Sequence, residues 1–368
     1  MIHDARRVEA YWRALQFVAP DAVVVDIGTG LGLFAFLACQ AGARKVYAIE
    51  SDEVIAVARQ LAAGNGYEER IEFIEEISSN VTLPEQADVI ISDLGGAIPF
   101  FGQHVPSIVD ARKRFLKPNG VLLPKYDTVW AAVVNAPAVH QKIRPAIDPA
   151  LELDMRLAWN MAANISSNTT FKEAQLATEP RVVANLDYYQ IEDANVHAKI
   201  NWDVTRSGYG HGINLWFERT LADGVFFSTR PGNPETVYGA LFLPWPEPVQ
   251  LNESDFVELE IRADYQKDEY IWSWNTRVSS ATQLKYTFRQ SDFFGTPRSP
   301  ARLRKQRPIH VPTLNDVGRT DRLVLSLIDG KKSIKEIAVE LQHQFPKRFA
   351  TSEQAIGYVA DFSRKYSL

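Results

Sequence analysis

The chain has 368 residues, which is long for one ordinary domain and predicts two or three. Hydrophobic residues make up 46% and charged residues 23%, the balance of a folded globular protein and not of a disordered one. The formal net charge of −5 argues against a general binder of nucleic acids or membrane surfaces.

The single cysteine, Cys39, excludes an intrachain disulfide and fits a reducing compartment. The first twenty residues carry charges throughout, so they do not resemble a signal peptide. No run of apolar residues is long enough for a membrane span. We therefore expect a cytoplasmic protein without a membrane partner.

Residues 1–125 alternate between apolar strand-like runs and helical patterns. The segment 22–28, AVVVDIG, is a continuous β-branched run of the kind that fills a parallel strand buried on both faces. The alternation predicts a doubly wound, Rossmann-like parallel α/β sheet. Further strands are expected at 45–50, 71–76 and 87–93, and helices at 32–42, 53–63 and 106–116.

The pattern changes at 126–295, where segments rich in Val, Ile, Tyr and Trp are separated by turn residues. This composition predicts an antiparallel sheet or β-barrel domain. Residues 140–178 are less regular, include a possible helix at 151–163, and are interpreted as an inserted arm. The expected strands cover 128–134, 196–204, 213–219, 237–245, 256–265 and 270–278.

The stretch 296–308 holds five basic residues, three prolines and no acid, which predicts a linker, with contact to an acidic partner as the alternative. Helical patterns follow at 319–330, 333–345 and 351–366 and predict a small satellite domain. Ser333 stands three residues before Glu336, the spacing of a capping box.

The most informative segment, DIGTGLG, joins a strand to a helix. Gly28, Gly30 and Gly32 let the backbone turn tightly and let a ligand approach without a Cβ in the way. Glu50 ends the next strand, where an acid accepts hydrogen bonds from both hydroxyls of a ribose. Asp26, just before the first glycine, would repel the pyrophosphate of a dinucleotide, whose fingerprint also has a different glycine spacing.

S-adenosylmethionine has no phosphate, and its α-amino group and sulfonium favour nearby carboxylates. The order of glycine turn, Asp26, Glu50 and the strand ADVIISD (87–93) therefore predicts S-adenosylmethionine as the cofactor of a methyltransferase. A scaffold or binding protein that keeps this fold without a cofactor is the alternative. The scattered histidines and the single cysteine indicate no metal site.

The motifs VVDIGTGLG, AGARKVYAIE and ADVIISD resemble those of the protein arginine methyltransferase family, and the resemblance runs from residue 1 to about 295. It implies a class I methyltransferase with a Rossmann-like domain, a β-barrel and a dimerisation arm, here 140–178, and hence a homodimer. In that match, MIHDARR covers the cofactor and Arg7 pairs with its carboxylate. Ser78 and Ser79 fall where this fold often contacts adenine, and a helix N-cap is the alternative.

The chain departs from that family in the acceptor site. Two glutamates of the family grip the substrate guanidinium; here the first falls at Asp93 and the second at Gly102. The family's Thr-His-Trp loop falls at 235–237, where this chain has no histidine. A histidine or amide nitrogen, a hydroxyl or a carboxylate is therefore favoured over arginine as acceptor. Asp93 and His104 are the candidate catalytic groups, and a turn-capping aspartate and an exposed loop histidine are the alternatives.

Residues 309–368 lie outside this resemblance and are similar to the PqqD-like family. The similarity is carried by the segment IHVPTL, a short helix ending in DG, a serine-initiated helix with EIA, and a final helix. It implies a small winged-helix module that binds the leader segment of a ribosomally made peptide as an added strand. The combination predicts a peptide methyltransferase. A protein arginine or small-molecule methyltransferase, with an unrelated three-helix cap, is the alternative.

Overall fold

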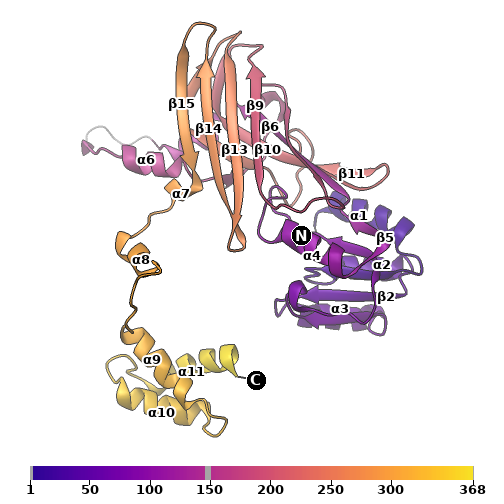
Figure 1. Cartoon of the computed structure of the whole chain (residues 1–368), viewed down its shortest axis with the longest axis vertical. Helices are drawn as coiled ribbons and strands as arrows, with labels where there is room; N and C mark the ends of the chain where they lie inside the picture. The colour runs from indigo at the N-terminus through magenta and orange to yellow at the C-terminus, as the bar shows by residue number, and fades with distance from the viewer. Residues whose placement is uncertain (1–2, 146–150, 368) are drawn as a thin grey trace. The chain divides into compact units, whose positions relative to one another are not determined.

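The computed structural model describes residues 3–145 and 151–367 (Figure 1). The chain divides into two compact units, Met1–Thr296 and Pro297–Leu368, which are described separately below. Within the described residues, no helix has the length and apolar character needed to cross a membrane.

The first unit opens with a parallel sheet of five strands in the order β3-β2-β1-β4-β5. All five residues of β1 are buried, as the continuous apolar run predicts, because the strand lies in the middle of the sheet. The expected doubly wound parallel fold is confirmed. Its elements are α1 (Ala5–Val18), β1 (Val23–Ile27), α2 (Leu33–Gln40), β2 (Lys45–Glu50), α3 (Ile55–Asn65), β3 (Ile71–Glu75), the 3-10 turn η1 (Ser78–Asn80), β4 (Ala87–Ser92), α4 (His104–Arg114) and β5 (Leu116–Leu123).

Helix α1 links this sheet to the rest of the unit. It begins after Asp4, whose side chain accepts a hydrogen bond from the backbone N–H of Arg7. The helix packs against α2 on one side and against strands β10 and β11 of the second half of the unit on the other. Arg7 lies in its first turn and is buried, so the helix carries a guanidinium into the junction between the two halves.

Two antiparallel sheets form the second half of the unit, as expected from its composition. The sheets share a core, in which the Trp245 indole donates to the Thr276 hydroxyl and the Trp274 indole to the Pro244 carbonyl. The strands are β6 (Tyr126–Val134), β7 (Ser167–Asn168), β8 (Arg181–Asp187), β9 (Val196–Asp203), β10 (Gly208–Ala222), β11 (Val225–Ser228), β12 (Leu241–Leu251), β13 (Phe256–Gln266), β14 (Glu269–Ser279) and β15 (Leu284–Ser291).

The expected arm at 140–178 includes residues 146–150, which lie outside the described residues. Its described part holds most of α5 (Pro137–Ile143), then α6 (Arg156–Ala162) and η3 (Glu173–Gln175). Helix α6 is shorter than the predicted 151–163, and no residue of it is buried. The short helix α7 (Asp292–Gly295) ends the unit.

The second unit contains α8 (Pro300–Lys305), which lies inside the expected linker, and three longer helices, α9 (Asp316–Leu327), α10 (Ile334–Gln344) and α11 (Ser352–Tyr366). The capping box of Ser333 and Glu336 is confirmed. Between residues 297 and 367 the structure contains no strand, so it does not show the wing expected of a winged helix. The helices enclose a core of their own, formed by Val324, Ile337, Ala338, Leu341, Phe349, Ala355 and Val359.

Candidate active site

A cavity of about 680 Å³ lies at the carboxyl ends of β1, β2, β3 and β4, where open α/β sheets bind their ligands. Its volume is within the range of roughly 300–1,000 Å³ that cofactor and small-molecule sites occupy. The lining residues are Arg7, Ile27, Gly28, Thr29, Gly30, Leu31, Leu33, Phe34, Ile49, Glu50, Ser51, Val54, Glu76, Ile77, Ser78, Asp93, Leu94, Gly95, Phe101, Gly102, Gln103 and Ser107.

The glycine turn forms one wall of this cavity. Gly28 and Gly30 line it with positive φ angles of 70° and 54°. A Cβ on Gly30 would meet no atom within 4 Å and would extend into open space. Gly32, also predicted to bind the cofactor, is not a lining residue. It is the N-cap of α2, with a φ of 85°. Gly30 therefore leaves room for a ligand. A Cβ on Gly28 would lie 2.2 Å from the Leu94 side chain, and Gly32 shapes the helix start.

Asp26 differs from its prediction, because it lies behind the turn and not on the cavity surface. Its carboxylate accepts the Thr29 hydroxyl at 2.6 Å and the backbone N–H of Ala35. Burial raises the pKa of Asp26 to about 6, although both hydrogen bonds oppose this rise. The side chain thus supports the glycine turn and does not reach a ligand directly.

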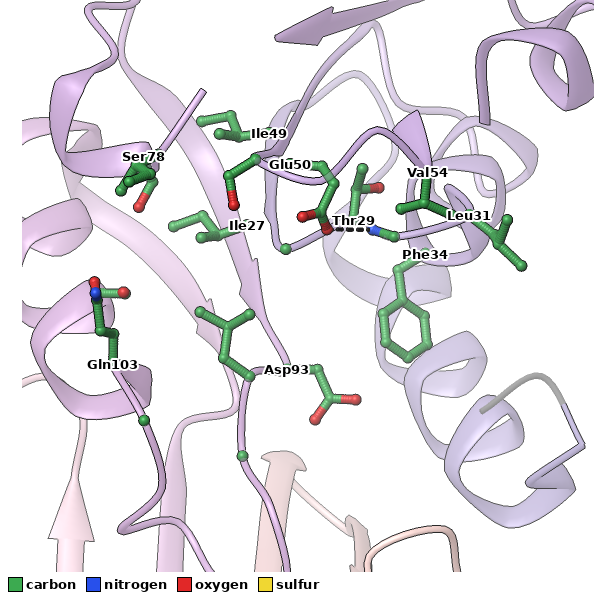
Figure 2. Close-up of a pocket in the computed structure, with 18 of the residues that line it drawn as sticks. Ile27, Thr29, Leu31, Phe34, Ile49, Glu50, Val54, Ser78, Asp93 and Gln103 are labelled. Atoms are coloured by element: carbon green, nitrogen blue, oxygen red, sulfur yellow. Dashed lines mark hydrogen bonds between the residues drawn. The ribbon is translucent and has the colours of Figure 1, made fainter. Parts of the chain in front are cut away.

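Glu50 and Ser78 line the cavity as predicted. One Glu50 oxygen accepts the Gly30 backbone N–H and the other the Asp52 N–H, each at 3.0 Å, so the carboxylate is held at the strand end. Figure 2 shows Glu50 and Ser78 in the upper part of the cavity, with Asp93 below them. Ser79, by contrast, is exposed and does not line the cavity.

Asp93 follows β4 and lines the other end of the cavity. One of its oxygens accepts Arg7 Nε at 2.5 Å and the other accepts Arg219 Nη1 at 2.6 Å. The Tyr238 hydroxyl lies 2.6 and 2.7 Å from the two oxygens and donates to them. Burial alone would raise the pKa of Asp93, but Arg219 and Arg7 hold it below its usual value. Asp93 is an ionised carboxylate held by distant side chains and does not cap its own turn.

Arg7 reaches the cavity from α1, and its guanidinium lies 4.5 Å from the centre of the Phe34 ring. Its Nε also donates to the Tyr238 hydroxyl at 3.0 Å. The expected pairing with a cofactor carboxylate remains a prediction. The position fits it, because Arg7 borders both the glycine-turn helix and Asp93.

His104 does not occupy the place expected of an exposed loop residue. It is the first residue of α4, has no exposed surface, and is not a lining residue of the cavity. Its Nε2 lies 3.0 Å from the Tyr188 hydroxyl and 3.3 Å from Arg219 Nη2. Burial, helped by Arg219, lowers the pKa of His104 to about 3. A neutral, enclosed imidazole cannot reach an acceptor in the cavity, so this geometry does not support a catalytic role.

Four residues of this network were not predicted from the sequence: Asp127, Tyr188, Arg219 and Tyr238. Arg219 and Asp127 lie directly opposite each other on β10 and β6. Both stand on the core face of their strands, since Phe217 and Val129, two residues away along each strand, are buried. Charged residues on the buried face of a strand require partners. A charged residue in each of these two apolar strands was the sequence feature that could have predicted the ion pair. Within the described residues, no group of three or more potential ligands could hold a metal ion.

Comparison with known proteins extends this picture. The family model of ribosomal protein L11 methyltransferase (PrmA) matches residues 11–142. Protein arginine N-methyltransferase 6 of Xenopus tropicalis is 28% identical over 69% of this chain and 79% of its own length. A probable protein arginine N-methyltransferase 6 of Arabidopsis thaliana is also 28% identical, but this chain spans only 52% of its length.

Two solved structures share the fold. Arabidopsis thaliana protein arginine methyltransferase 10 superposes with a TM-score of 0.71 at 23% identity, covering 79% of this chain and 95% of that one. The Trypanosoma brucei PRMT1 enzyme-prozyme complex with AdoHcy gives the same TM-score and coverage at 20% identity. Together with the glycine turn, Glu50 and the cavity, these likenesses identify a class I methyltransferase that depends on S-adenosylmethionine.

Proposed function

We propose that this methyltransferase transfers a methyl group to a side chain of a peptide, which the unit 297–368 recruits through its leader segment. The observation that carries the proposal of an acceptor site is the position of Asp93. This ionised carboxylate shares one cavity with the glycine turn and Glu50 and lies at its opposite end. A methyl donor held at the glycine turn would face an acceptor beside Asp93.

The residues of the cavity fit the parts of the cofactor. Glu50 would accept the two ribose hydroxyls, since it is fixed by backbone amides and faces the cavity. Ser78 would lie beside the adenine, and Arg7 would pair with the cofactor carboxylate. Gly30 would let the cofactor approach the backbone, since a Cβ there would extend into open space.

When bound, the cofactor supplies a methyl group on a sulfonium sulfur. This methyl group would pass to the acceptor's lone pair, and the electrons of the broken carbon–sulfur bond would stay on the sulfur. The acceptor's proton would pass to water. Asp93 would orient the acceptor for this in-line displacement by accepting a hydrogen bond from it.

Peptide recruitment is proposed from the second unit. The segment before α9 has no regular secondary structure over 310–315, and it carries strongly exposed apolar residues, including Ile309 and Val311 at 80% and 81% exposure. An extended leader peptide could pair with this segment and cover its apolar side chains. Tethering raises the effective concentration of the peptide, so the catalytic pocket need bind the acceptor only weakly.

A homodimer is part of the proposal. The arm carries exposed apolar side chains at Leu151, Leu153 and Leu157, with exposures of 58%, 61% and 75%. Covering such side chains is a reason for two copies to associate. A molar mass in solution equal to that of one chain would contradict this part of the proposal.

The alternative is methylation of arginine, the activity in the names of the relatives described above. Gly102, at the place expected for the family's second glutamate, lines the cavity without a carboxylate. This observation favours a different acceptor.

Co-expression of the full chain with a candidate precursor peptide tests the proposal. We expect the peptide to gain the mass of one methyl group, and we expect residues 1–296 alone to bind S-adenosylmethionine but to methylate the peptide far more slowly. Equal rates for the two proteins would refute leader recruitment. Calorimetry that detects no cofactor binding to the full chain would refute the enzyme function as a whole.

A further inference from the structure

The arginine Arg219 is buried at the junction of the two halves of the first unit, next to the acceptor end of the cavity. Its exposed fraction is zero. Its Nε and Nη2 donate to the two oxygens of Asp127 at 2.9 and 2.7 Å, and Nη1 donates to Asp93 at 2.6 Å. Two carboxylates therefore grip one planar guanidinium, with a paired contact on one side.

This arrangement joins the two halves of the unit. Asp93 comes from the end of β4 in the parallel sheet, whereas Asp127 and Arg219 face each other across β6 and β10. The Arg219 guanidinium also lies 5.1 Å from the ring centre of Phe217 and 5.9 Å from that of Tyr238. The chain thus provides its own arginine with the carboxylates and aromatic rings that a substrate arginine would need.

The charges of the cluster are already balanced. Arg7 and Arg219 are matched by Asp93 and Asp127, and Asp127 accepts a third hydrogen bond from the Tyr188 hydroxyl at 2.6 Å. Burial keeps His104 neutral, because it lowers the pKa of that ring to about 3.

A cationic acceptor would lack a carboxylate partner at this end of the cavity. Among the described lining residues the acids are Glu50, Glu76 and Asp93. Glu50 ends β2 and Glu76 follows β3, both at the cofactor end. The methyl donor is itself a sulfonium cation. A guanidinium or ammonium brought in beside it would be desolvated next to two arginines and one positive sulfur, with no unpaired carboxylate to offset the cost.

We infer that Arg219 is a specificity-determining residue. Its guanidinium lies between Asp93 and Asp127, where a cationic substrate would otherwise bind, so that the methyl acceptor is an uncharged polar group and not arginine or lysine. This inference rests on the proposed methyltransferase function and names its substrate class. An amide, a hydroxyl or a neutral imidazole could approach Asp93 without adding charge to the cluster.

Binding of methylguanidinium to the full chain, saturated with S-adenosylhomocysteine, tests the inference, with methylurea as the uncharged probe of the same shape. We expect neither probe to bind the wild type saturably. The variant Arg219→Gly removes the guanidinium from between Asp93 and Asp127. Methylguanidinium should then bind at least tenfold more tightly than to the wild type and raise the melting temperature, whereas methylurea should do neither. The variant Arg219→Lys keeps a cation between the two carboxylates, so it should not bind methylguanidinium saturably.

A second measurement needs no variant. The full chain is incubated with methyl-labelled S-adenosylmethionine and an arginine-glycine peptide, and the hydrolysate is analysed for methylarginine. Saturable methylguanidinium binding by the wild type, or formation of methylarginine, would overturn the inference. Loss of S-adenosylmethionine binding, read by calorimetry on the same sample, would instead count against the proposed function.

Discussion

Glu50 tests the assignment of the ribose at the scale of one residue. Replacing Glu50 with alanine removes a charged acceptor that faces the cavity, so S-adenosylmethionine should bind more weakly by roughly 1–3 kcal/mol. Isothermal calorimetry measures the change. Glu75→Ala is a matched control, because Glu75 pairs with Glu50 in the next strand but is exposed and outside the cavity. Equal effects of the two substitutions would mean that the ribose lies elsewhere.

His104 predicts a pH dependence of stability. Its pKa is about 3 in the folded chain, against an ordinary value of 6.5, because the ring is buried beside Arg219. As the pH falls below 6.5, His104 binds a proton in the unfolded chain but not in the folded one. The free energy of unfolding therefore decreases progressively down to about pH 3. His104→Gln removes that contribution.

We therefore expect the wild type to lose about 3 kcal/mol of unfolding free energy relative to His104→Gln when the pH is lowered from 7 to 4. Urea unfolding at the two pH values measures it. The control is His310→Gln, which makes the same substitution at an exposed position. A constant difference for His104→Gln would show that the ring is protonated in the fold.

The sequence identified single residues of the cofactor site better than those of the acceptor site. Gly28 and Gly30 belong to one short turn and Glu50 ends the next strand along the chain, so their place in the cavity could be predicted from the order of these elements. The partners Asp93 and Arg219 are far apart in the chain and meet only because β10 reaches the end of β4. Strand register between distant segments cannot be derived from periodicity alone, so this pairing was not predicted.

At the scale of elements, Gly30 in the turn between β1 and α2 can be compared with Gly66, which follows α3. Gly30 and Gly66 both have positive φ, 54° and 72°, and a Cβ on either would meet no atom within 4 Å. Alanine should therefore strain the backbone similarly at both sites, by about 1 kcal/mol. Of these two glycines, Gly30 lines the cavity and Gly66 does not. Of the two substitutions, Gly30→Ala alone should therefore weaken S-adenosylmethionine binding, by tenfold or more.

Melting temperatures and cofactor affinities of both variants check this prediction. A Gly30→Ala protein with unchanged affinity would mean that the cofactor does not approach the turn. Similar affinity losses in the two variants would trace the effect to general destabilisation of the sheet.

The first four strands of the parallel sheet match the structure within two residues at each end, and β1, β2 and β4 were predictable because their runs are largely apolar and buried. Strand β5 was not predicted. The antiparallel sheets were predicted less completely. Strands β7, β8, β11 and β15 were missed. Only two of the seven residues of β8 and three of the eight residues of β15 are buried, which weakens the apolar signal. Strand β12 extends to Leu251 through three prolines, which sequence rules place outside a central strand.

At the scale of the whole molecule, the two units have separate hydrophobic cores, since the cluster around Val324 and Leu341 contains only residues of the second unit. Each core can lose its packing independently, so calorimetric unfolding of the full chain should show two transitions. S-adenosylmethionine binds the folded first unit, and at a free concentration of 100 times its dissociation constant it should stabilise that unit by about 2.7 kcal/mol. Only one of the two transitions should therefore move with cofactor, and it should be the one that residues 1–296 show alone. A single transition that shifts as a whole would mean that the units unfold cooperatively, and that the second unit cannot be removed without cost to the first.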